Sequence, residues 1–205
     1  MTAADCLQIL REVKDCAFAT VDEHGIPQNR IIDVMLVEKE RLFFLTARGK
    51  HFYTQLLHGK TAAITGLNSR WQTVRLVGKV EKLAEQKYWI DRFFELNPSM
   101  NSVYPGDARY ILEPFCIQDG ELEFFDLSDT PIRRESFRLG EGAVTPKGFI
   151  VTDACIGCGL CAENCPQKCI TPGEPYGIAQ QNCLHCGLCF ENCPVQAIAR
   201  REDLA

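Results

Sequence analysis

The sequence has 205 residues, of which 46% are hydrophobic and 24% are charged, and its formal net charge is −5. These proportions are typical of a globular protein and exclude a disordered or collagen-like chain. No apolar run approaches the ~20 residues that a membrane-spanning helix requires. We therefore expect a cytoplasmic protein with no membrane partner, long enough for one domain of ordinary size and one small domain.

The chain up to about residue 127 alternates short apolar stretches with polar turns. Near the N-terminus, Leu7, Leu10 and Val13 recur at helical spacing, and Thr2 can cap the helix that this spacing predicts. The expected strands are 16–21, 28–37, 41–46, 61–65, 71–80, 111–117 and 122–126, and the other expected helices are 51–57 and 83–96. Tight turns favour antiparallel pairing, and closing such strands into a small or split β-barrel leaves few exposed edges. This part of the chain is therefore predicted to be mainly β with helices, an α+β fold.

Residues 130–148 differ from the segments on either side because they combine Pro131 and Pro146 with several glycines. Such a composition is typical of a connection between domains. We therefore expect a barrel domain at 1–129, a linker at 130–148 and a small domain at 149–205.

The small domain contains two cysteine runs that repeat each other at an offset of 28 residues. Each run has the spacing Cys-x2-Cys-x2-Cys-x3-Cys-Pro. The first run consists of Cys155, Cys158, Cys161 and Cys165, and the second of Cys183, Cys186, Cys189 and Cys193. Neighbouring glycine, leucine, glutamate and asparagine residues repeat at the same offset, so this is a duplicated unit.

Two other interpretations of these cysteines are a disulfide framework and a pair of zinc sites. Four-cysteine zinc sites usually have separated Cys-x2-Cys pairs, not three cysteines in tandem. Disulfides need an oxidising compartment, and the first residues lack the basic stretch and apolar core of an export signal. The remaining cysteines have no pairing pattern and are interpreted as reduced thiols: Cys6, Cys16, Cys116 and Cys169.

The cysteine spacing resembles the bacterial-type ferredoxin module with two [4Fe–4S] clusters, in which each repeat supplies the fourth ligand of the other cluster. The resemblance implies one cluster held by Cys155, Cys158, Cys161 and Cys193. It implies a second cluster held by Cys183, Cys186, Cys189 and Cys165. Cys169 is not expected to be a ligand, since the second repeat has Ala197 at its position. His185 is expected at the surface or beside the cluster and not on its iron.

A second resemblance covers about residues 1–127. Its residues are Asn-Arg-Ile-Ile at 29–32, Leu-Phe-Phe-Leu-Thr at 42–46 followed by Lys50, and Trp-Gln-Thr-Val-Arg-Leu-Val-Gly-Lys-Val-Glu at 71–81. These segments, in this order of elements, resemble the pyridoxamine 5′-phosphate oxidase-like family of FMN-binding split barrels. The resemblance implies a homodimer with the flavin between the two subunits.

The same resemblance indicates which residues would bind FMN. Family members place an Arg of the second strand, and a Thr and a Lys after the third, at the flavin phosphate, which corresponds to Arg30, Thr46 and Lys50. Arg48 lies in the same basic loop and can add charge, since a phosphate needs cationic and hydroxyl donors. Gln72 and Thr73 correspond to the polar groups at the edge of the isoalloxazine ring. Judged without the resemblance, each basic residue is more simply a solvated side chain at a strand end.

The resemblance also limits the activity. The C-terminal substrate-binding stretch of true vitamin B6 oxidases is absent, so oxidation of pyridoxamine phosphate is not expected. Related barrels bind a deazaflavin or haem, which stay as alternatives to FMN. The sequence contains no recognisable catalytic acid–base pair, so no catalytic residue is assigned.

A flavin exchanges one or two electrons, and a [4Fe–4S] cluster exchanges one. The first hypothesis is a flavo-iron–sulfur oxidoreductase that moves single electrons through two clusters to or from FMN, which reacts with a small substrate. The alternative is an electron carrier whose barrel serves for dimerisation and docking. From Ile150 onward, six acidic and three basic residues give a net charge of −3. This charge favours a redox partner protein with a basic surface and disfavours nucleic acid.

Overall fold

The computed structural model describes residues 1–204 and divides them into two compact units. Unit 1 consists of Met1–Glu123 and Ser136–Gly142, and unit 2 consists of Phe124–Glu135 and the residues from Ala143 onward. The segment 130–148, expected as a linker, contains the strand β8 (Arg133–Leu139) and is shared between both units. The chain therefore enters unit 2 twice.

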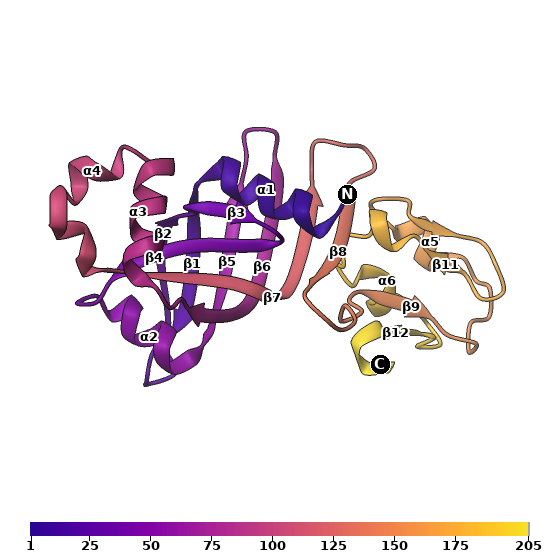
Figure 1. The fold of residues 1–205 in the computed structure, drawn as a ribbon. Coiled ribbons are helices and arrows are strands. Elements are labelled where there is room, and N and C mark those ends of the chain that lie inside the picture. The colour runs from indigo at the N-terminus through magenta and orange to yellow at the C-terminus, as the bar shows by residue number, and fades with distance from the viewer. Residues whose placement is uncertain (205) are drawn as a thin grey trace. The chain divides into compact units, whose positions relative to one another are not determined.

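Unit 1 is built around an antiparallel sheet that curls into a half-barrel (Figure 1). Its strand order is β2-β1-β5-β6-β7-β4-β3, with β8 paired to β7. The other strands are β1 (Asp15–Val21), β2 (Pro27–Asp33), β3 (Leu36–Glu38), β4 (Arg41–Ala47), β5 (Thr61–Leu67), β6 (Gln72–Lys82) and β7 (Leu112–Asp126). The predicted fold class, α+β with a curled sheet of short strands, is therefore confirmed.

The expected strand 28–37 is divided into β2 and β3. Val34 and Met35 lie between them and are buried, and their backbone N–H groups bond to other segments. The N–H of Val34 donates to the Lys14 carbonyl at 2.9 Å, and that of Met35 donates to the Phe43 carbonyl at 2.8 Å. These bonds bend the chain from one edge of the sheet to the other.

The expected strands 111–117 and 122–126 form the single strand β7. Gly120 lies inside this strand, where a Cβ atom would be 2.5 Å from the Val77 carbonyl oxygen and 2.7 Å from the Gly78 Cα atom. Only glycine allows β6 and β7 to approach this closely. The chain therefore continues through this position as one long strand.

Four helices accompany the sheet. They are α1 (Ala3–Val13), α2 (His51–Gly59), α3 (Gln86–Leu96) and α4 (Met100–Val103), followed by the 3₁₀ segment η1 (Gly106–Ile111). As predicted, Thr2 caps α1: its hydroxyl accepts from the Asp5 N–H at 3.2 Å, and Asp5 accepts from the Thr2 N–H at 2.8 Å. Helix α3 begins three residues later than expected because β6 extends to Lys82. Among the described residues, no helix has the length and apolar character needed to cross a membrane.

Aromatic side chains inside the barrel hold α2 in place. Phe52 of α2 lies with its ring centre 6.3 Å from that of Phe18 and 6.1 Å from that of Phe44. Phe44 also stacks on Phe115 of β7 at 5.7 Å. Burial of such rings is a large hydrophobic contribution. It fixes the first turn of α2 against β1 and β4.

Unit 2 has very short elements around a small core. They are β9 (Phe149–Val151), α5 (Leu160–Asn164), β10 (Ile170–Thr171), β11 (Gly177–Ile178), η2 (Gln180–Asn182), α6 (Leu188–Glu191), β12 (Ile198–Arg200) and η3 (Arg201–Leu204). β9 pairs with β12, and β10 pairs with β11. Half of the eight buried core residues are cysteines. A core with so few large apolar side chains depends on what the cysteines bind.

Candidate functional site

The two cysteine runs fold into loops with the same backbone conformation. Gly159 and Gly187 are equivalent residues that precede α5 and α6, with φ values of +81° and +82°. Lys168 and Gln196 are also equivalent, with φ values of +50° and +53°. Positive φ is uncommon outside glycine. Its recurrence at the same offset shows that the duplication extends to the backbone.

Backbone N–H groups point at sulfur atoms in both loops. The N–H of Gly157 donates to Cys155 Sγ at 3.4 Å, and the N–H of His185 donates to Cys183 Sγ at 3.4 Å. Such bonds stabilise a thiolate and so favour a metal-bound sulfur. His185 has a φ of +57° where the first repeat has a glycine at +71°. The histidine therefore occupies a backbone position that favours glycine, while its N–H still serves the same sulfur contact.

Each loop borders a small cavity lined by four cysteines of the two runs. The cysteines of the first cavity, which has a volume of about 20 Å³, are Cys155, Cys158, Cys161 and Cys193. The second cavity has the same volume, and its run cysteines are Cys165, Cys183, Cys186 and Cys189. Each set combines three cysteines of one run with the last cysteine of the other. The structure thus brings together the two sets that the resemblance assigns as ligands.

Cys169 also lines the second cavity, where its sulfur lies 3.5 Å from the Cys165 sulfur. Its equivalent, Ala197, lines the first cavity. Both residues are buried, with exposures of 6% and 1%. This position therefore forms part of the wall of both cavities. That Cys169 is not a ligand of the second cluster stays a prediction.

Residues 124–135, which the sequence placed with the barrel and the linker, contact the loop that borders the second cavity. Asn182 Nδ2 donates to the Ile132 carbonyl at 2.9 Å, and the Arg134 guanidinium donates to the Leu184 carbonyl at 3.5 Å. The same guanidinium lies 4.5 Å from the centre of the Phe125 ring. Both hydrogen bonds join residues 50 positions apart, outside the cysteine spacing, so no sequence signal pointed to them.

In unit 1, two of the expected flavin-binding residues lie at the start of α2. Lys50 is the N-cap residue of this helix and makes no side-chain capping bond. Arg30 of β2 has its guanidinium carbon 4.5 Å from the centre of the Phe52 ring, in the first turn of α2. Partial burial lowers the pKa of Arg30. The positive end of the helix dipole adds to the two charges, so this end of α2 is suited to an anionic group.

Thr46 and Arg48 lie on the segment that leads into α2, and they differ in their partners. The Thr46 hydroxyl is buried and has no hydrogen-bond partner among the described residues. Arg48 donates to the buried Glu113 carboxylate at 3.0 Å, and Lys82 lies 3.1 Å from the same carboxylate. The charge of Arg48 is thus shared with an acid 65 positions away in the sequence, whereas Thr46 has an unused donor.

Gln72 and Thr73 are not brought to the start of α2. The strand register, followed through β1 and β5, places Arg30 in the same row as Leu76 of β6. Gln72 and Thr73 lie at the other end of β6, three strands away from β2. Their expected role at the edge of the flavin ring, away from the phosphate, stays a prediction.

Comparison with protein families assigns both units. Residues 3–100 match the family model described as pyridoxamine 5′-phosphate oxidase, and residues 154–197 match the 4Fe-4S dicluster domain. The chain joins a pyridoxamine 5′-phosphate oxidase-like split barrel to a 4Fe-4S dicluster domain. Both family resemblances are therefore confirmed. A comparison with curated proteins found no match.

Solved structures resemble the pyridoxamine 5′-phosphate oxidase-like barrel. A NimC/NimA family protein of Clostridium acetobutylicum is 20% identical with a TM-score of 0.56, covering 66% of this chain and 90% of its own. General stress protein 26 of Bacillus anthracis str. Sterne is 13% identical with a TM-score of 0.53, covering 68% and 100%. A heme-binding protein from Mycobacterium smegmatis is 12% identical with a TM-score of 0.52, covering 67% and 58%. At these identities the likeness shows the fold.

The dicluster domain has the donor chemistry that iron–sulfur clusters require. Four thiols converge on each of two similar cavities, and backbone N–H groups face sulfur in both. The family match therefore favours [4Fe–4S] clusters over the zinc and disulfide interpretations. The cysteines that line each cavity are the residues that would hold its cluster.

The pyridoxamine 5′-phosphate oxidase-like barrel likewise fits a flavin phosphate. The Thr46 hydroxyl is buried and has no partner among the described residues, and such a donor costs stability until a ligand accepts from it. Lys50, Arg30 and the helix N-terminus supply positive charge on the same side of α2. These groups would bind the phosphate, while Arg48 is the weaker contributor because Glu113 shares its charge.

Proposed function

We propose that the protein is an oxidoreductase in which two [4Fe–4S] clusters pass single electrons to or from FMN in the barrel, which serves a small substrate. The observation that carries the proposal is the presence, in one chain, of two four-cysteine cavities and a flavin-type split barrel. Clusters supply one-electron chemistry, and a flavin supplies both one- and two-electron chemistry. Their combination is useful where a one-electron carrier meets a two-electron reaction.

The flavin site is proposed to be completed by a second copy of the chain. Arg30, Thr46 and Lys50 of one subunit would hold the phosphate, with Arg48 beside them. Gln72 and Thr73 lie on β6, three strands away from β2, and we assign these two contacts with the flavin ring to the partner subunit.

The outer face of the barrel sheet supports a dimer. On this face Ala17 pairs with Ile31, and Ala63 pairs with Val77. Ile31 is 62% exposed and Val77 is 54% exposed. Small alanines flanked by exposed branched side chains make an apolar surface on which a second sheet can pack.

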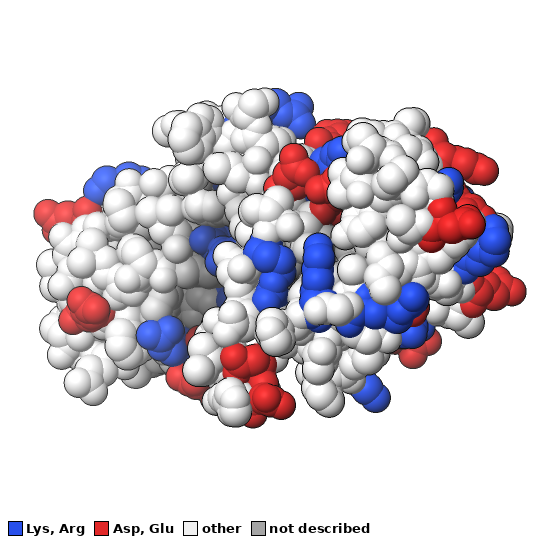
Figure 2. Space-filling model, turned by 90° about the vertical axis from the view of Figure 1, so that its left-hand side faces the viewer, with Lys and Arg blue, Asp and Glu red and all other residues white. Residues whose placement is uncertain are grey.

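The dicluster domain is proposed to exchange electrons with a redox partner protein. Its net charge of −3 from Ile150 onward, before the charge of any cluster, favours a partner with a basic docking surface. Figure 2 turns toward the viewer the left-hand side of Figure 1, where the barrel helices α3 and α4 are drawn, and on that face acidic and basic side chains are both exposed. The docking proposal for the dicluster domain depends on its own net charge. Association should therefore weaken as the ionic strength rises.

The first test is the cofactor content of protein purified without oxygen. We expect about eight irons, with matching sulfide, and about one FMN per chain. Reduction of the clusters by a limiting amount of dithionite should then reduce the flavin. About eight irons with no flavin, even after addition of FMN, would favour the alternative of an electron carrier whose barrel only docks.

The proposed contact between Lys50 and the flavin phosphate can be tested by comparing substitutions at the two ends of α2. Lys50 is the N-cap and Lys60 is the C-cap of this helix, so Lys50→Gln and Lys60→Gln remove the same charge at opposite ends. We expect Lys50→Gln to bind FMN at least about tenfold more weakly, since it loses a charged hydrogen bond to the phosphate. Lys60→Gln should bind as tightly as the unchanged protein. Equal affinities in both variants would remove Lys50 from the phosphate site.

A further inference from the structure

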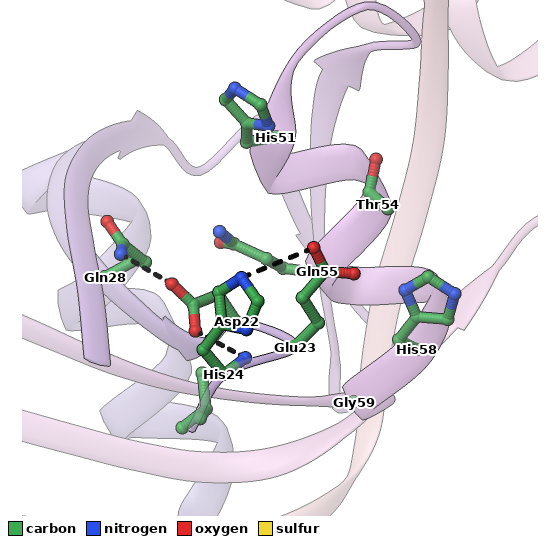
Figure 3. Close-up of a pocket in the computed structure, with 10 residues that line it drawn as sticks. Asp22, Glu23, His24, Gln28, His51, Thr54, Gln55, His58 and Gly59 are labelled. Atoms are coloured by element: carbon green, nitrogen blue, oxygen red, sulfur yellow. Dashed lines mark hydrogen bonds and ion pairs between the residues drawn. The ribbon is translucent and has the colours of Figure 1, made fainter. Parts of the chain in front are cut away.

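A cavity of about 640 Å³ between the β1–β2 turn and α2 has no role in the proposed electron transfer (Figure 3). Its volume is in the range of small-molecule sites. The residues that matter for its chemistry are Asp22, Gln28, His51, Thr54, Gln55 and His58. Three of the four histidines of the chain line it, His24 being the third.

Gln55 presents a hydrogen-bond donor to this cavity. Its Oε1 atom accepts from the Thr20 hydroxyl at 2.6 Å and from the Arg30 guanidinium at 2.9 Å. A guanidinium can only donate, so the oxygen of Gln55 must face Arg30 and the amide nitrogen must point away. Gln55 is 9% exposed, and among the described residues its Nε2 atom has no hydrogen-bond acceptor. The cavity is therefore lined by an oriented N–H donor on a side chain that is 9% exposed.

Gln28 presents an acceptor to the same cavity. Its Nε2 atom donates to Asp22 Oδ2 at 2.9 Å. The backbone N–H of Ile26, together with Gln28 and the N–H of His24, holds the pKa of Asp22 below its ordinary value. The carboxylate is thus ionised and can only accept, which turns the carbonyl oxygen of Gln28 away from it. Figure 3 shows the Gln55 side chain reaching from α2 toward Gln28 on β2.

An oriented donor beside an oriented acceptor matches a ligand group that carries a carbonyl and an N–H side by side. Carboxamides and lactams have this pair. His51 and His58 are seven residues apart on α2, which places them on one face about 10 Å apart and offers ring surfaces to a planar ligand. Asp22 and Glu23 disfavour an anion. We propose that this cavity binds a neutral, planar heterocycle with a carboxamide or lactam edge, of the nicotinamide or pyrimidine kind.

The test compares isosteric ligands on the full chain purified without oxygen. Binding of nicotinamide, uracil and nicotinate is measured by calorimetric titration and by saturation-transfer NMR. We expect nicotinamide or uracil to bind at least about tenfold more tightly than nicotinate, which lacks the N–H and carries a negative charge. The tighter of the two neutral ligands identifies whether the carboxamide or the lactam is preferred. Equal binding of nicotinate, or no saturable binding of either neutral ligand, would overturn the proposal.

Variants test the donor directly. Gln55→Glu keeps an acceptor for Arg30 and Thr20 but replaces the N–H donor with an oxygen, so it should weaken binding of the neutral ligand at least about tenfold. Gln28→Leu removes the acceptor and should have a similar effect. Gln8→Glu makes the same chemical change on the exposed face of α1 and should bind as the unchanged protein does. Because Gln55→Glu also affects Arg30, ligand binding and not flavin content is the readout. Unchanged binding in Gln55→Glu would contradict the site.

Discussion

The two cysteine cavities of the dicluster domain have the same backbone but different covers. Three cysteines of the second cavity, Cys165, Cys183 and Cys189, are each at most 8% exposed, and Cys186 is exposed. In the first cavity Cys158 is exposed, and Cys155, Cys161 and Cys193 are partly exposed. Residues 124–135 belong to the same unit and form hydrogen bonds with the second loop, and we attribute the lower exposure to these contacts. Duplication of a ligand loop therefore produces two sites of equal donor chemistry, and an added segment makes their surroundings unequal.

Solvent exposure and nearby charge set the potential and the oxygen sensitivity of an iron–sulfur cluster. The covered second cavity should therefore protect its cluster better than the open first cavity. Arg134 also places a positive charge beside the second loop. The two clusters are thus expected to differ in function although their ligand spacing is identical.

Removal of one ligand from each cavity should have the largest effect. Cys161→Ala should eliminate the first cluster and Cys189→Ala the second, leaving about four irons per chain in each variant. Cys189 also belongs to the buried core with Phe149 and Ile198. We therefore expect the second variant to have the lower unfolding temperature. Iron analysis and calorimetry under anaerobic conditions measure both effects, and retention of about eight irons by either variant would refute its ligand assignment.

The cover of the second cavity can be opened by truncating Ile132, which is 5% exposed. Ile132→Ala should lower stability by about 2–5 kcal/mol, as expected for a buried isoleucine. In air, the second cluster should then decay as fast as the first. The decay is measured by EPR spectroscopy as the loss of one signal for each cluster. Leu127→Ala is the control in the same segment, because Leu127 is 52% exposed. Slower decay of the second cluster in both variants would show that this segment does not provide the protection.

The two domains and many of their elements were predictable because they depend on the spacing of residues close together in the sequence. The eight run cysteines are visible as a short repeated motif, and their pairing across repeats is what the resemblance to the two-cluster ferredoxin module implied. The start of α1 followed from Thr2 and the leucines after it. Periodicity also located the curled sheet. These features need no knowledge of distant contacts.

The features that sequence reasoning missed depend on residues far apart in the chain. β7 is one strand because Gly120 packs closely against Gly78 of β6. β8 lies inside the expected linker because it pairs with β7. Arg48 shares its charge with Glu113, 65 positions away, which the sequence alone does not show. The orientation of Gln55 likewise depends on Arg30 from another strand. Pairings of this kind have no local signature.

Removing the charge of Arg134 should change the midpoint potential of the second cluster and not that of the first, with little effect on stability. Arg134→Gln removes the positive charge beside Leu184, so the reduced, more negative second cluster is disfavoured and its midpoint potential should fall. The first cluster should keep its potential. Arg133→Gln is the matched control, because Arg133 is exposed and paired with Glu135. Equal shifts of both clusters, or a shift in the control, would mean that the charge acts at long range and not through the cover.

The smallest effect is expected at the wall position that is Cys169 in the second cavity and Ala197 in the first. Cys169→Ala copies into the second cavity the residue that the first cavity already has, Ala197. Both clusters should therefore be retained, and stability should fall by only about 1 kcal/mol, the cost of a small void at a buried side chain. The reciprocal Ala197→Cys adds a thiol to a first-cavity wall that is 1% exposed, and should cost more through overpacking while retaining iron. Iron content and urea unfolding are measured for both variants. Loss of iron in Cys169→Ala would show that Cys169 is needed to hold the second cluster and is not only a wall residue.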